Sequence, residues 1–562
     1  MDLIRKKTLV VGLDAACWDY LDPLLQTGRL PTLQRLMNAG MWGTLHSTLP
    51  AWTPTAWASI ITGKNPGKHG IFGMMWRRPG TYEFSPTNAQ VRMGTPFWKR
   101  LNEHGLRVGL VNVPFTHPPD AVDGFVVCGF GTPSSVPDIT YPPEVIGWIE
   151  ERFGRYEPAV DTKLFRTARP SEILEAEQKH QACQFRIAME LADRYQVEVL
   201  AINLMLLDHA NHYMPYMDQV EQAICQSDAD LARLIQAFHP DNVLLISDHG
   251  SRRVKGVFLL YNWLLDHGYC AQIERTPSES SAALNWLLVN WLQGARNWSG
   301  LQEKILRHLC KQALLRLPDW ITLRLWRSIE RDIPLARQYV LLTDRTDYSR
   351  SRVFPEAQYS GLLYFNVAGR EPTGVVPPQD QPALSAELAT KVAQIVDPET
   401  GQSLFFGVYT PEDLYAGPAV EHAPDLILDS FDGPWSVMTS YRESLAGCLQ
   451  NGYFADRSGD LGQHSRDGIF VFSGQDFNVG PASRDGHVMD IPATLLHLYG
   501  VPIPEDYDGR VMTETVTPAF AAQCPVIYQP GDQEATISLE SPYSPEETEE
   551  LLGHLRALGY MD

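Results

Sequence analysis

The sequence has no paired cysteines and no long apolar run. Its eight cysteines stand singly, without a C-x-x-C pair, which is typical of reduced, buried thiols and not of a disulfide framework. The longest apolar run, AALNWLLVNWL from Ala282 to Leu292, is too short to cross a bilayer. The first apolar run, TLVVGL, is predicted to be a strand and leaves no room for a secretion signal. We therefore expect a globular protein in the cytoplasm, without a transmembrane segment.

Basic residues are in the minority. The chain has 46 Lys and Arg against 67 Asp and Glu, for a formal net charge of −21. Sequence-independent nucleic-acid binding depends on a basic surface, so this balance argues against a nucleic-acid partner. It still allows a small anionic substrate, because bound divalent metals can reverse the local field.

Two familiar motifs for phosphate and sulfate chemistry are also missing. A P-loop requires G-x-x-x-x-G-K-[ST], but only three residues separate Gly63 from Gly67, and His69 stands where Ser or Thr would be needed. The nucleophile motifs of sulfatases, C-x-P-S-R and S-x-P-S-R, do not occur. The segment TPTAWASIITGKNPGKHG, residues 53–70, is therefore not predicted to be a nucleotide cradle.

Short apolar runs alternate with helical patterns along the chain. Runs without polar alternation are typical of strands buried on both faces, as in a parallel sheet covered by helices. The segment LPTLQRLMNAG predicts a helix with Pro31 in its first turn and Gly40 at its end. The pattern predicts an α/β fold with sites beyond the carboxyl ends of the strands. The five strand candidates are residues 8–13, 107–113, 197–204, 242–247 and 468–473.

A chain of 562 residues predicts one large domain with insertions, or two to three domains. We expect an α/β core formed by residues 1–277 and 341–520, and a C-terminal tail and helix in 521–562. Residues 278–340 are rich in Trp and Leu and are expected to form a helical insertion. Between Leu301 and Arg331 it has seven Lys or Arg against three Asp or Glu. We expect this insertion to pack on the core; the alternatives are a lid over the site and a peripheral surface that touches membrane lipid.

Acidic residues and histidines gather at the predicted strand ends. An Asp after a strand is often a helix cap, so each has a structural explanation by itself. The spacing D-x-x-x-H places Asp208 and His212 on one face of a helix. As a set, three Asp and three His suit Zn²⁺, and Mn²⁺ also tolerates them. Six ligands are too many for one tetrahedral site but enough for two ions, which together could clamp a displacement at phosphorus. The set comprises Asp14, Asp208, His212, Asp248, His249 and His464.

The order of these residues resembles the alkaline phosphatase superfamily. It is most similar to the type I phosphodiesterase/nucleotide pyrophosphatase branch, in particular its bacterial cytoplasmic members, in which a Thr nucleophile precedes a TG-x-x-P-x-x-HG stretch. That stretch runs here from Thr62 to Gly70, and counting back places Thr53 at the nucleophile position, with Thr55 as the competing candidate. The resemblance extends from about Thr8 to Met512. It implies a three-layer α/β/α fold with a central, mostly parallel sheet.

The resemblance also implies an activity and a division of the ligands. Asp208, His212 and His464 would hold one divalent ion, and a second would be held by Asp14, Asp248, His249 and the oxygen of Thr53. The ions would be zinc, with manganese as the alternative. The implied reaction is hydrolysis of phosphate esters, with phosphodiester or pyrophosphate bonds favoured, through a phosphothreonine on Thr53. A phosphonate or phosphomonoester hydrolase, a transferase on the same site and a non-catalytic anion-binding protein are the alternatives.

One position departs from the family pattern. Nucleotide pyrophosphatases carry an Asn shortly after the HG that binds a phosphate oxygen, and Met74 stands there in this chain. A thioether cannot donate that hydrogen bond. Either Lys68 or Asn112 supplies the donor, or the anionic group is held differently. Lys68 would otherwise be a solvated loop residue and Asn112 a partner of the backbone near its strand end. The change weakens the case for nucleotide diesters more than the case for metal-assisted hydrolysis.

Overall fold

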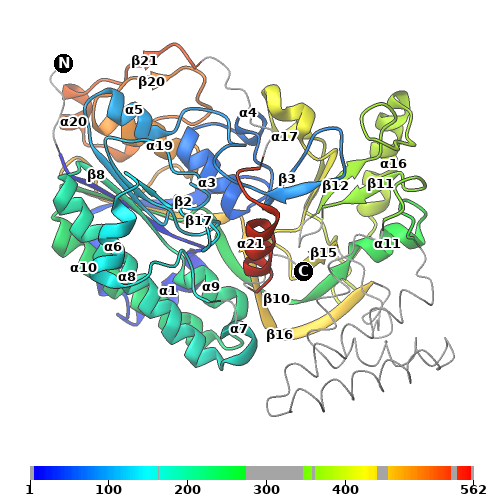
Figure 1. Cartoon of the computed structure of the whole chain (residues 1–562), viewed down its shortest axis with the longest axis horizontal. Coiled ribbons are helices and arrows are strands. Elements are labelled where there is room, and N and C mark those ends of the chain that lie inside the picture. The colour runs from blue at the N-terminus through cyan, green and yellow to red at the C-terminus, as the bar shows by residue number, and fades with distance from the viewer. Residues whose placement is uncertain are drawn as a thin grey trace, which may run out of the picture.

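The computed structural model describes residues 6–161, 164–273, 346–356, 361–439, 453–532 and 541–557. The predicted insertion 278–340 and its basic stretch 301–331 lie outside these residues. The expected domain limits at residues 277, 340 and 520 therefore stay a prediction. The described part consists of a large sheet with helices on both faces and a smaller region of short sheets beside it (Figure 1).

All five predicted strands are present, and they are neighbours in the central sheet. Strands β9, β1, β8, β5 and β6 run parallel, and β17 is antiparallel both to β9 on one side and to β2 on the other. Every residue of β1 is buried, as unbroken apolar runs predict for a sheet that is covered on both faces. The sheet order is β18 (Gly480–Pro481), β2 (Gly40–His46), β17 (Asp467–Gly474), β9 (Asn242–Ile246), β1 (Thr8–Leu13), β8 (Val199–Leu204), β5 (Val108–Val111), β6 (Gly124–Val127) and β7 (Thr140–Tyr141), with β19 (Gly486–His487) also paired to β2.

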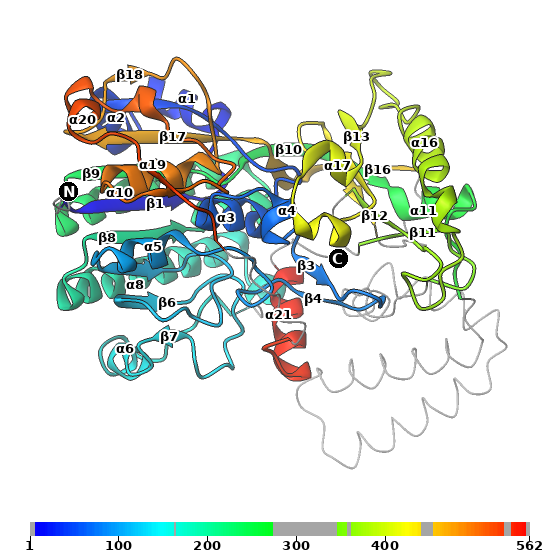
Figure 2. The same ribbon diagram turned by 90° about the horizontal axis from the view of Figure 1, so that it is seen from above.

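Helices cover the two faces of the sheet, which gives the expected three layers (Figures 1 and 2). One layer holds α1 (Trp18–Gln26), α2 (Pro31–Asn38), α8 (Pro170–Tyr195) and α10 (Met217–Phe238). The other holds α3 (Thr53–Thr62), α5 (Phe97–Glu103) and α19 (Asp490–Leu498). Helix α2 begins at Pro31 and ends before Gly40, as predicted. Outside these layers are α4 (Pro66–His69), α6 (Val145–Phe153), α7 (Leu164–Thr167), α9 (Leu206–Tyr213), α20 (Pro518–Gln523) and the C-terminal α21 (Pro545–Ala557).

A smaller region with its own apolar cluster adjoins the carboxyl-end edge of the sheet. It contains a three-stranded sheet of β15 (Trp435–Met438), β10 (Gly250–Leu259) and β16 (Phe454–Ser465), and a four-stranded sheet of β11 (Val353–Pro355), β12 (Leu362–Phe365), β14 (Leu426–Asp429) and β13 (Gly407–Tyr409). Helices α11 (Leu260–Asp266), α16 (Gln381–Val392) and α17 (Pro411–Leu414) belong to it. Strand β10 starts directly after β9, and β16 ends directly before β17. This antiparallel pair therefore connects the two regions.

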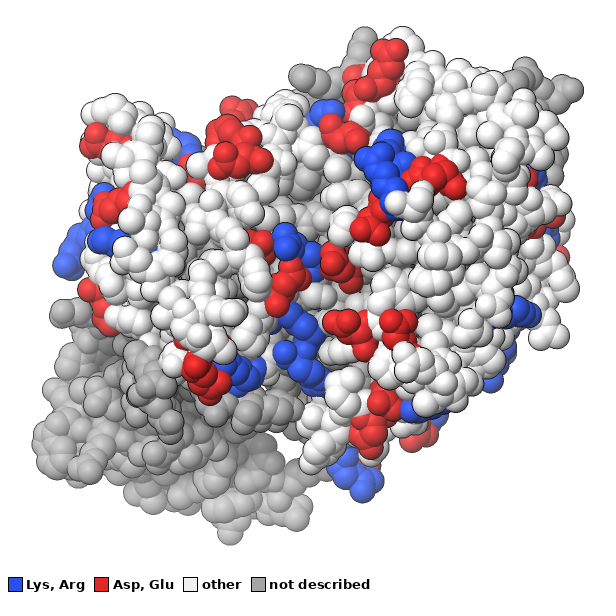
Figure 3. Space-filling model, turned by 180° about the vertical axis from the view of Figure 1, so that it is seen from behind, with Lys and Arg blue, Asp and Glu red and all other residues white. Residues whose placement is uncertain are grey.

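An antiparallel pair of strands, a parallel pair of strands and three short 3-10 helices complete the described structure. The pairs are β3 (Met75–Arg77) with β4 (Phe84–Pro86) and β20 (Ile503–Pro504) with β21 (Tyr528–Gln529), and the 3-10 helices are η1 (Pro378–Asp380), η2 (Pro418–His422) and η3 (Thr513–Thr515). Basic and acidic side chains are mixed on the face shown in Figure 3, in keeping with charges of both signs throughout the chain. Among the described helices, none has the length and apolar content needed to cross a membrane.

Candidate metal centre

The predicted ligands meet at the carboxyl edge of the central strands. Asp14 directly follows β1, and its carboxylate Oδ2 accepts a hydrogen bond of 2.8 Å from Nδ2 of Asn203 on β8. The backbone N–H of Asp14 donates to the carbonyl of Leu204, 3.1 Å away. Because β1 and β8 are parallel neighbours, these bonds hold Asp14 at the end of the sheet. The Asp14 side chain is fully buried.

Two serines fix the SDHG turn beside Asp14. Ser247 Oγ accepts from the N–H of Ala16 at 2.8 Å and donates to the carbonyl of His249 at 2.6 Å. Ser251 Oγ donates to the carbonyl of Ala15 at 2.7 Å. Ala15 has a left-handed backbone with φ of 64°, a strained conformation for alanine that surrounding bonds must hold. The two hydroxyls thus clamp together the turns that carry the ligands of the predicted second metal.

One ligand set lies around the imidazole of His249. Its Nε2 is 3.5 Å from Asp14 Oδ1 and 3.3 Å from Asp248 Oδ2. These three atoms lie close enough to share one ion. The family resemblance implies that Asp14, Asp248 and His249 form one set, and the structure brings their side chains together.

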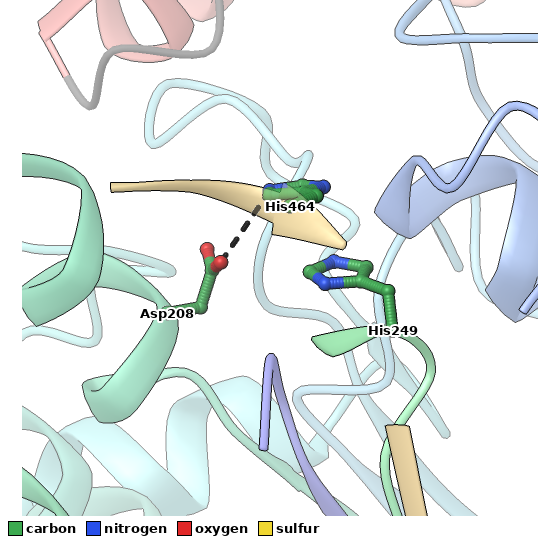
Figure 4. A group of neighbouring side chains, drawn as sticks. All are labelled: Asp208, His249 and His464. Carbon is green, nitrogen blue, oxygen red and sulfur yellow. Dashed lines mark ion pairs between the residues drawn. The ribbon is translucent and has the colours of Figure 1, made fainter. Parts of the chain in front are cut away.

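The other set joins helix α9 to strand β16. Asp208 Oδ1 is 3.5 Å from Nε2 of His212 and 3.5 Å from Nε2 of His464, and the two imidazole nitrogens are 2.9 Å apart. Figure 4 shows Asp208, His249 and His464 pointing toward a common centre from three different elements. Asp208, His249 and His464 also form a group that could hold an ion, and the rings of His249 and His464 stack with centroids 3.7 Å apart. The two sets are therefore contiguous.

Backbone carbonyls assign the tautomers of two histidines. His464 Nδ1 lies 2.9 Å from the carbonyl of Ala51, and His249 Nδ1 lies 3.1 Å from the carbonyl of Gly250. A carbonyl oxygen only accepts, so each Nδ1 must carry the proton. In the neutral imidazole each Nε2 is then the free nitrogen, and it faces the centre, which is the arrangement of a metal-binding histidine.

Thr53 is the first residue of α3, and its side chain reaches the same centre. Its Oγ1 lies 3.1 Å from Nε2 of His249. The start of a helix carries partial positive charge and unpaired N–H groups, which favour an anion. The competing Thr55 is also buried, but its hydroxyl has no hydrogen-bond partner within the described ranges. The geometry therefore favours Thr53 over Thr55.

Burial and repulsion shift the acid–base behaviour of the carboxyl groups. Burial, with the Asp208 charge added, raises the pKa of Asp14 to about 7. Burial and the charges of Asp14 and Asp208 raise the pKa of Asp248 well above its ordinary value. Burial opposes ionisation of Asp208 too, but His212 and His464 outweigh it and lower the pKa of Asp208. Asp14 and Asp248 thus resist ionisation where no cation is close.

Carboxylate oxygens without a hydrogen-bond donor indicate what would balance the negative charge of Asp14 and Asp248. Within the described residues, Oδ1 of Asp14 and both carboxylate oxygens of Asp248 have no hydrogen-bond donor. Burying such groups is costly unless a partner or a metal ion compensates. The donor set of carboxylate oxygens and unprotonated imidazole nitrogens fits divalent zinc or manganese. The residues present therefore fit a metal centre.

The stretch after Thr53 has a structural role. His69 Nδ1 accepts from the N–H of Ile71 at 3.2 Å, which leaves Nε2 as the donor to Ser59 Oγ at 3.0 Å. Burial lowers the pKa of His69 to about 3, so this histidine is neutral. Lys68 is partly exposed, and its Nζ donates to the carbonyl of Asp506 at 2.8 Å and to Asp508 Oδ1 at 2.6 Å.

Neither alternative donor for the missing Asn faces the metal ligands. Asn112 is bonded to backbone, as expected: its Nδ2 donates to Asn203 O and its Oδ1 accepts from Phe130 N–H, both at 2.9 Å. Met74 is fully buried within the main apolar cluster. A substrate phosphate would therefore be held without a side-chain amide at this position.

Sequence reasoning missed three residues whose hydrogen bonds hold the candidate ligands in place. These are Asn203, which bonds Asp14, and the serines Ser247 and Ser251, which flank D-H-G. The serines carried a usable signal, because small hydroxyl residues beside a buried turn are its natural hydrogen-bond partners. Asn203 could also have been found from the sequence, because it is a polar residue inside the apolar run VLAINL.

A sequence profile described as "Type I phosphodiesterase / nucleotide pyrophosphatase" matches residues 8–465. The chain belongs to this family. Membership supports hydrolysis of a phosphate ester by a metalloenzyme. A comparison with curated proteins finds no match.

Solved structures of related folds agree with the architecture. Phosphonoacetate hydrolase from Sinorhizobium meliloti, in complex with phosphonoacetate, has a TM-score of 0.51 at 15% identity, covering 87% of this chain and 94% of that chain. A mutant of the alkaline phosphatase PafA has a TM-score of 0.51 at 13% identity, covering 92% of this chain and 100% of that chain. At such low identity these likenesses establish an alkaline-phosphatase-like fold and nothing about the substrate.

Proposed function

We propose that the protein is a two-metal hydrolase of phosphate esters, with diesters as its preferred substrates and Thr53 as its nucleophile. One ion would be held by Asp208, His212 and His464, and the other by Asp14, Asp248, His249 and the oxygen of Thr53. The observation that carries the proposal is the position of Thr53 Oγ1, 3.1 Å from His249 Nε2, beside the buried Asp14 Oδ1 and the two Asp248 carboxylate oxygens, which have no hydrogen-bond donor among the described residues.

The side chains suit an in-line displacement at phosphorus. Divalent ions at these ligands would neutralise the phosphoryl oxygens and favour loss of the Thr53 hydroxyl proton. Thr53 gives its hydroxyl proton to solvent, Oγ1 forms a bond to phosphorus as the bond to the leaving alkoxide breaks, and the alkoxide takes a proton from solvent in turn. Attack by water on the phosphothreonine releases the product and restores Thr53. The N–H groups at the start of α3 would hold a phosphoryl oxygen in place of the missing side-chain amide.

The test is a substrate panel on protein loaded with zinc or manganese. Bis-p-nitrophenyl phosphate, p-nitrophenyl phosphate, a phosphonate ester and a sulfate ester would be compared by kcat/KM, with chelator-treated protein as the blank. We expect the highest value on the diester and none without metal. Protein that holds two ions per chain yet turns over neither phosphate ester would rule the proposal out.

Substitution of Thr53 tests the nucleophile, and substitution of Thr55 is the matched control. Thr53→Ala should lower kcat by at least about 10³-fold, since removing a covalent nucleophile costs this much or more in well-studied hydrolases. Metal content should stay near two ions per chain, because six protein ligands remain. Thr55→Ala removes the same atoms two residues away and should retain activity. Activity that survives in Thr53→Ala would exclude the assigned nucleophile.

A further inference from the structure

Arg252 on β10 has an unusual set of partners. Its Nε donates to the carbonyl of His464 at 3.0 Å and also bonds the carbonyl of Phe431. Its Nη2 donates to the carbonyls of Ser430 at 2.9 Å and Trp435 at 3.3 Å, and Nη1 bonds the carbonyl of Gly433. Each of these hydrogen bonds goes to backbone. An arginine more often pairs with carboxylates or phosphates.

The nearby carboxylates are bonded to a different arginine. Asp429 and Asp432 act on Arg252 through charge, while Arg466 lies 3.3 Å from Asp429 Oδ2 and donates to Asp432 Oδ2 at 2.6 Å. Arg252 thus bonds the backbone of the turn between β14 and β15, and Arg466 pairs with its carboxylates. Arg252 itself joins that turn to strand β16.

Both segments that Arg252 joins reach the candidate site. Strand β16 carries His464, a predicted metal ligand. The turn carries Phe431, whose ring packs edge-on against Trp52 with centroids 5.8 Å apart. Trp52 in turn packs against the imidazole of His464, with centroids 5.0 Å apart, and it directly precedes Thr53. The rings of Trp52 and Phe431 are buried and form an apolar wall beside the ligands.

We propose that Arg252 is a positioning residue that sets where His464 and the Trp52–Phe431 wall stand relative to the other metal ligands. The planar guanidinium presents five donors in a fixed fork and so spans two separate stretches of backbone. A lysine ammonium keeps the charge but is a single point on a flexible stem. The inference rests on the proposed function only in taking His464 as a metal ligand.

Loss of Arg252 should weaken the binding of only one of the two ions. Loss of the fork would let β16 shift against α9, and His464 would move relative to Asp208 and His212. The set of Asp14, Asp248 and His249 is held by Ser247, Ser251 and Asn203 and has no hydrogen bond from Arg252. Removing an outer partner of a metal ligand commonly weakens metal binding 10- to 100-fold. We expect the zinc affinity to fall by this factor at the site of His464, and to change by less than about threefold at the site of Asp14.

The experiment measures zinc binding to full-length Arg252→Lys and Arg252→Met by competition with a chromophoric chelator. Lys255→Met is the matched control, since Lys255 lies on the same strand and pairs with Asp397 at 2.9 Å and Glu399 at 2.7 Å. Urea unfolding of the metal-free proteins separates positioning from stability. Arg252→Lys should unfold close to wild type yet bind one ion 10- to 100-fold more weakly, and Lys255→Met should bind both ions normally.

Two results would overturn the inference. One is unchanged affinity at both sites in Arg252→Lys. The other is equal weakening at both sites together with lower stability of the metal-free protein, which would indicate a general structural role. If Arg252→Met fails to fold, Arg252→Lys alone still decides the matter. Failure of the proposed function would appear separately, as wild-type protein that binds zinc without hydrolysing any phosphate ester.

Discussion

Replacing Asp14 by Asn should have opposite effects on the metal-free and the metal-bound protein. In the metal-free state the pKa of Asp14 is raised from 3.8 to about 7. The folded protein then binds this proton more tightly than the unfolded chain, so stability falls as the pH rises from about 4 to about 7. One pKa unit corresponds to about 1.4 kcal/mol, so burying the ionised carboxylate at pH 8 costs on the order of 4 kcal/mol.

An Asn at this position removes that cost and can still accept the hydrogen bond from Asn203. Metal-free Asp14→Asn should therefore be more stable than metal-free wild type at pH 8, by up to about 4 kcal/mol. Zinc reduces this advantage, because wild type gains about 2.7 kcal/mol for each site at a free ion concentration of 100 times Kd and about 4.1 kcal/mol at 1,000 times Kd, so the order reverses above roughly that concentration. The variant loses that gain at the site of Asp14.

Urea unfolding at pH 8 measures both effects, with chelator in one series and zinc in the other. Asp19→Asn, an exposed residue in the first turn of α1, is the control and should change stability by less than about 0.5 kcal/mol. An Asp14→Asn protein that is less stable than wild type in chelator would refute the reasoning. So would a wild type whose stability does not respond to zinc.

Two further predictions concern residues around the ligands. A Cβ at Gly462 would lie 2.1 Å from the carbonyl oxygen of Asn211, so Gly462→Ala should push β16 away from α9 and weaken zinc binding at His464. The control Gly147→Ala adds a Cβ in open space and should leave zinc binding unchanged. A zinc titration of both variants measures the difference. Because the pKa of His69 is lowered to about 3, the folded state binds fewer protons than the unfolded chain below pH 6.5, so stability falls as the pH drops, by up to about 1.4 kcal/mol per unit. Urea unfolding of metal-free His69→Gln should show a smaller pH dependence than wild type between pH 6.5 and 5, and an unchanged slope would contradict the assignment.

The central strands were predictable because they are buried on both faces. Runs such as TLVVGL and NVLLIS need no alternation when helices cover both sides, so each stands out from its flanks. The clustering of these candidate ligands was predictable for a related reason. Asp14, Asp248 and His249 follow such strands directly, and parallel strands end at one edge of a sheet.

Strand β16 was not predicted. Its sequence, FADRSGDLGQHS, is polar and contains two glycines, and it forms a strand because it pairs with β10. Local sequence cannot show such pairing, because the two strands are about two hundred residues apart. The partners of Arg252 were hidden for the same reason, since its acceptors lie on β16, in the turn after β14 and at the start of β15, all far from it in sequence.

The departure at Met74 was visible in the sequence, but its consequence was not. The sequence left Lys68, Asn112 or a different mode of binding open. The structure gives Lys68 and Asn112 other partners, and these depend on contacts with Asp508 and Phe130 that no local pattern reveals. A different way of holding the phosphate is then favoured.

Anomalous diffraction from zinc-loaded crystals tests the central claim most directly. We predict two zinc peaks about 4 Å apart, one ligated by Asp208, His212 and His464, and the other by Asp14, Asp248 and His249 with Thr53 Oγ1 adjacent. A single peak, or two peaks away from these side chains, would contradict the two-metal account.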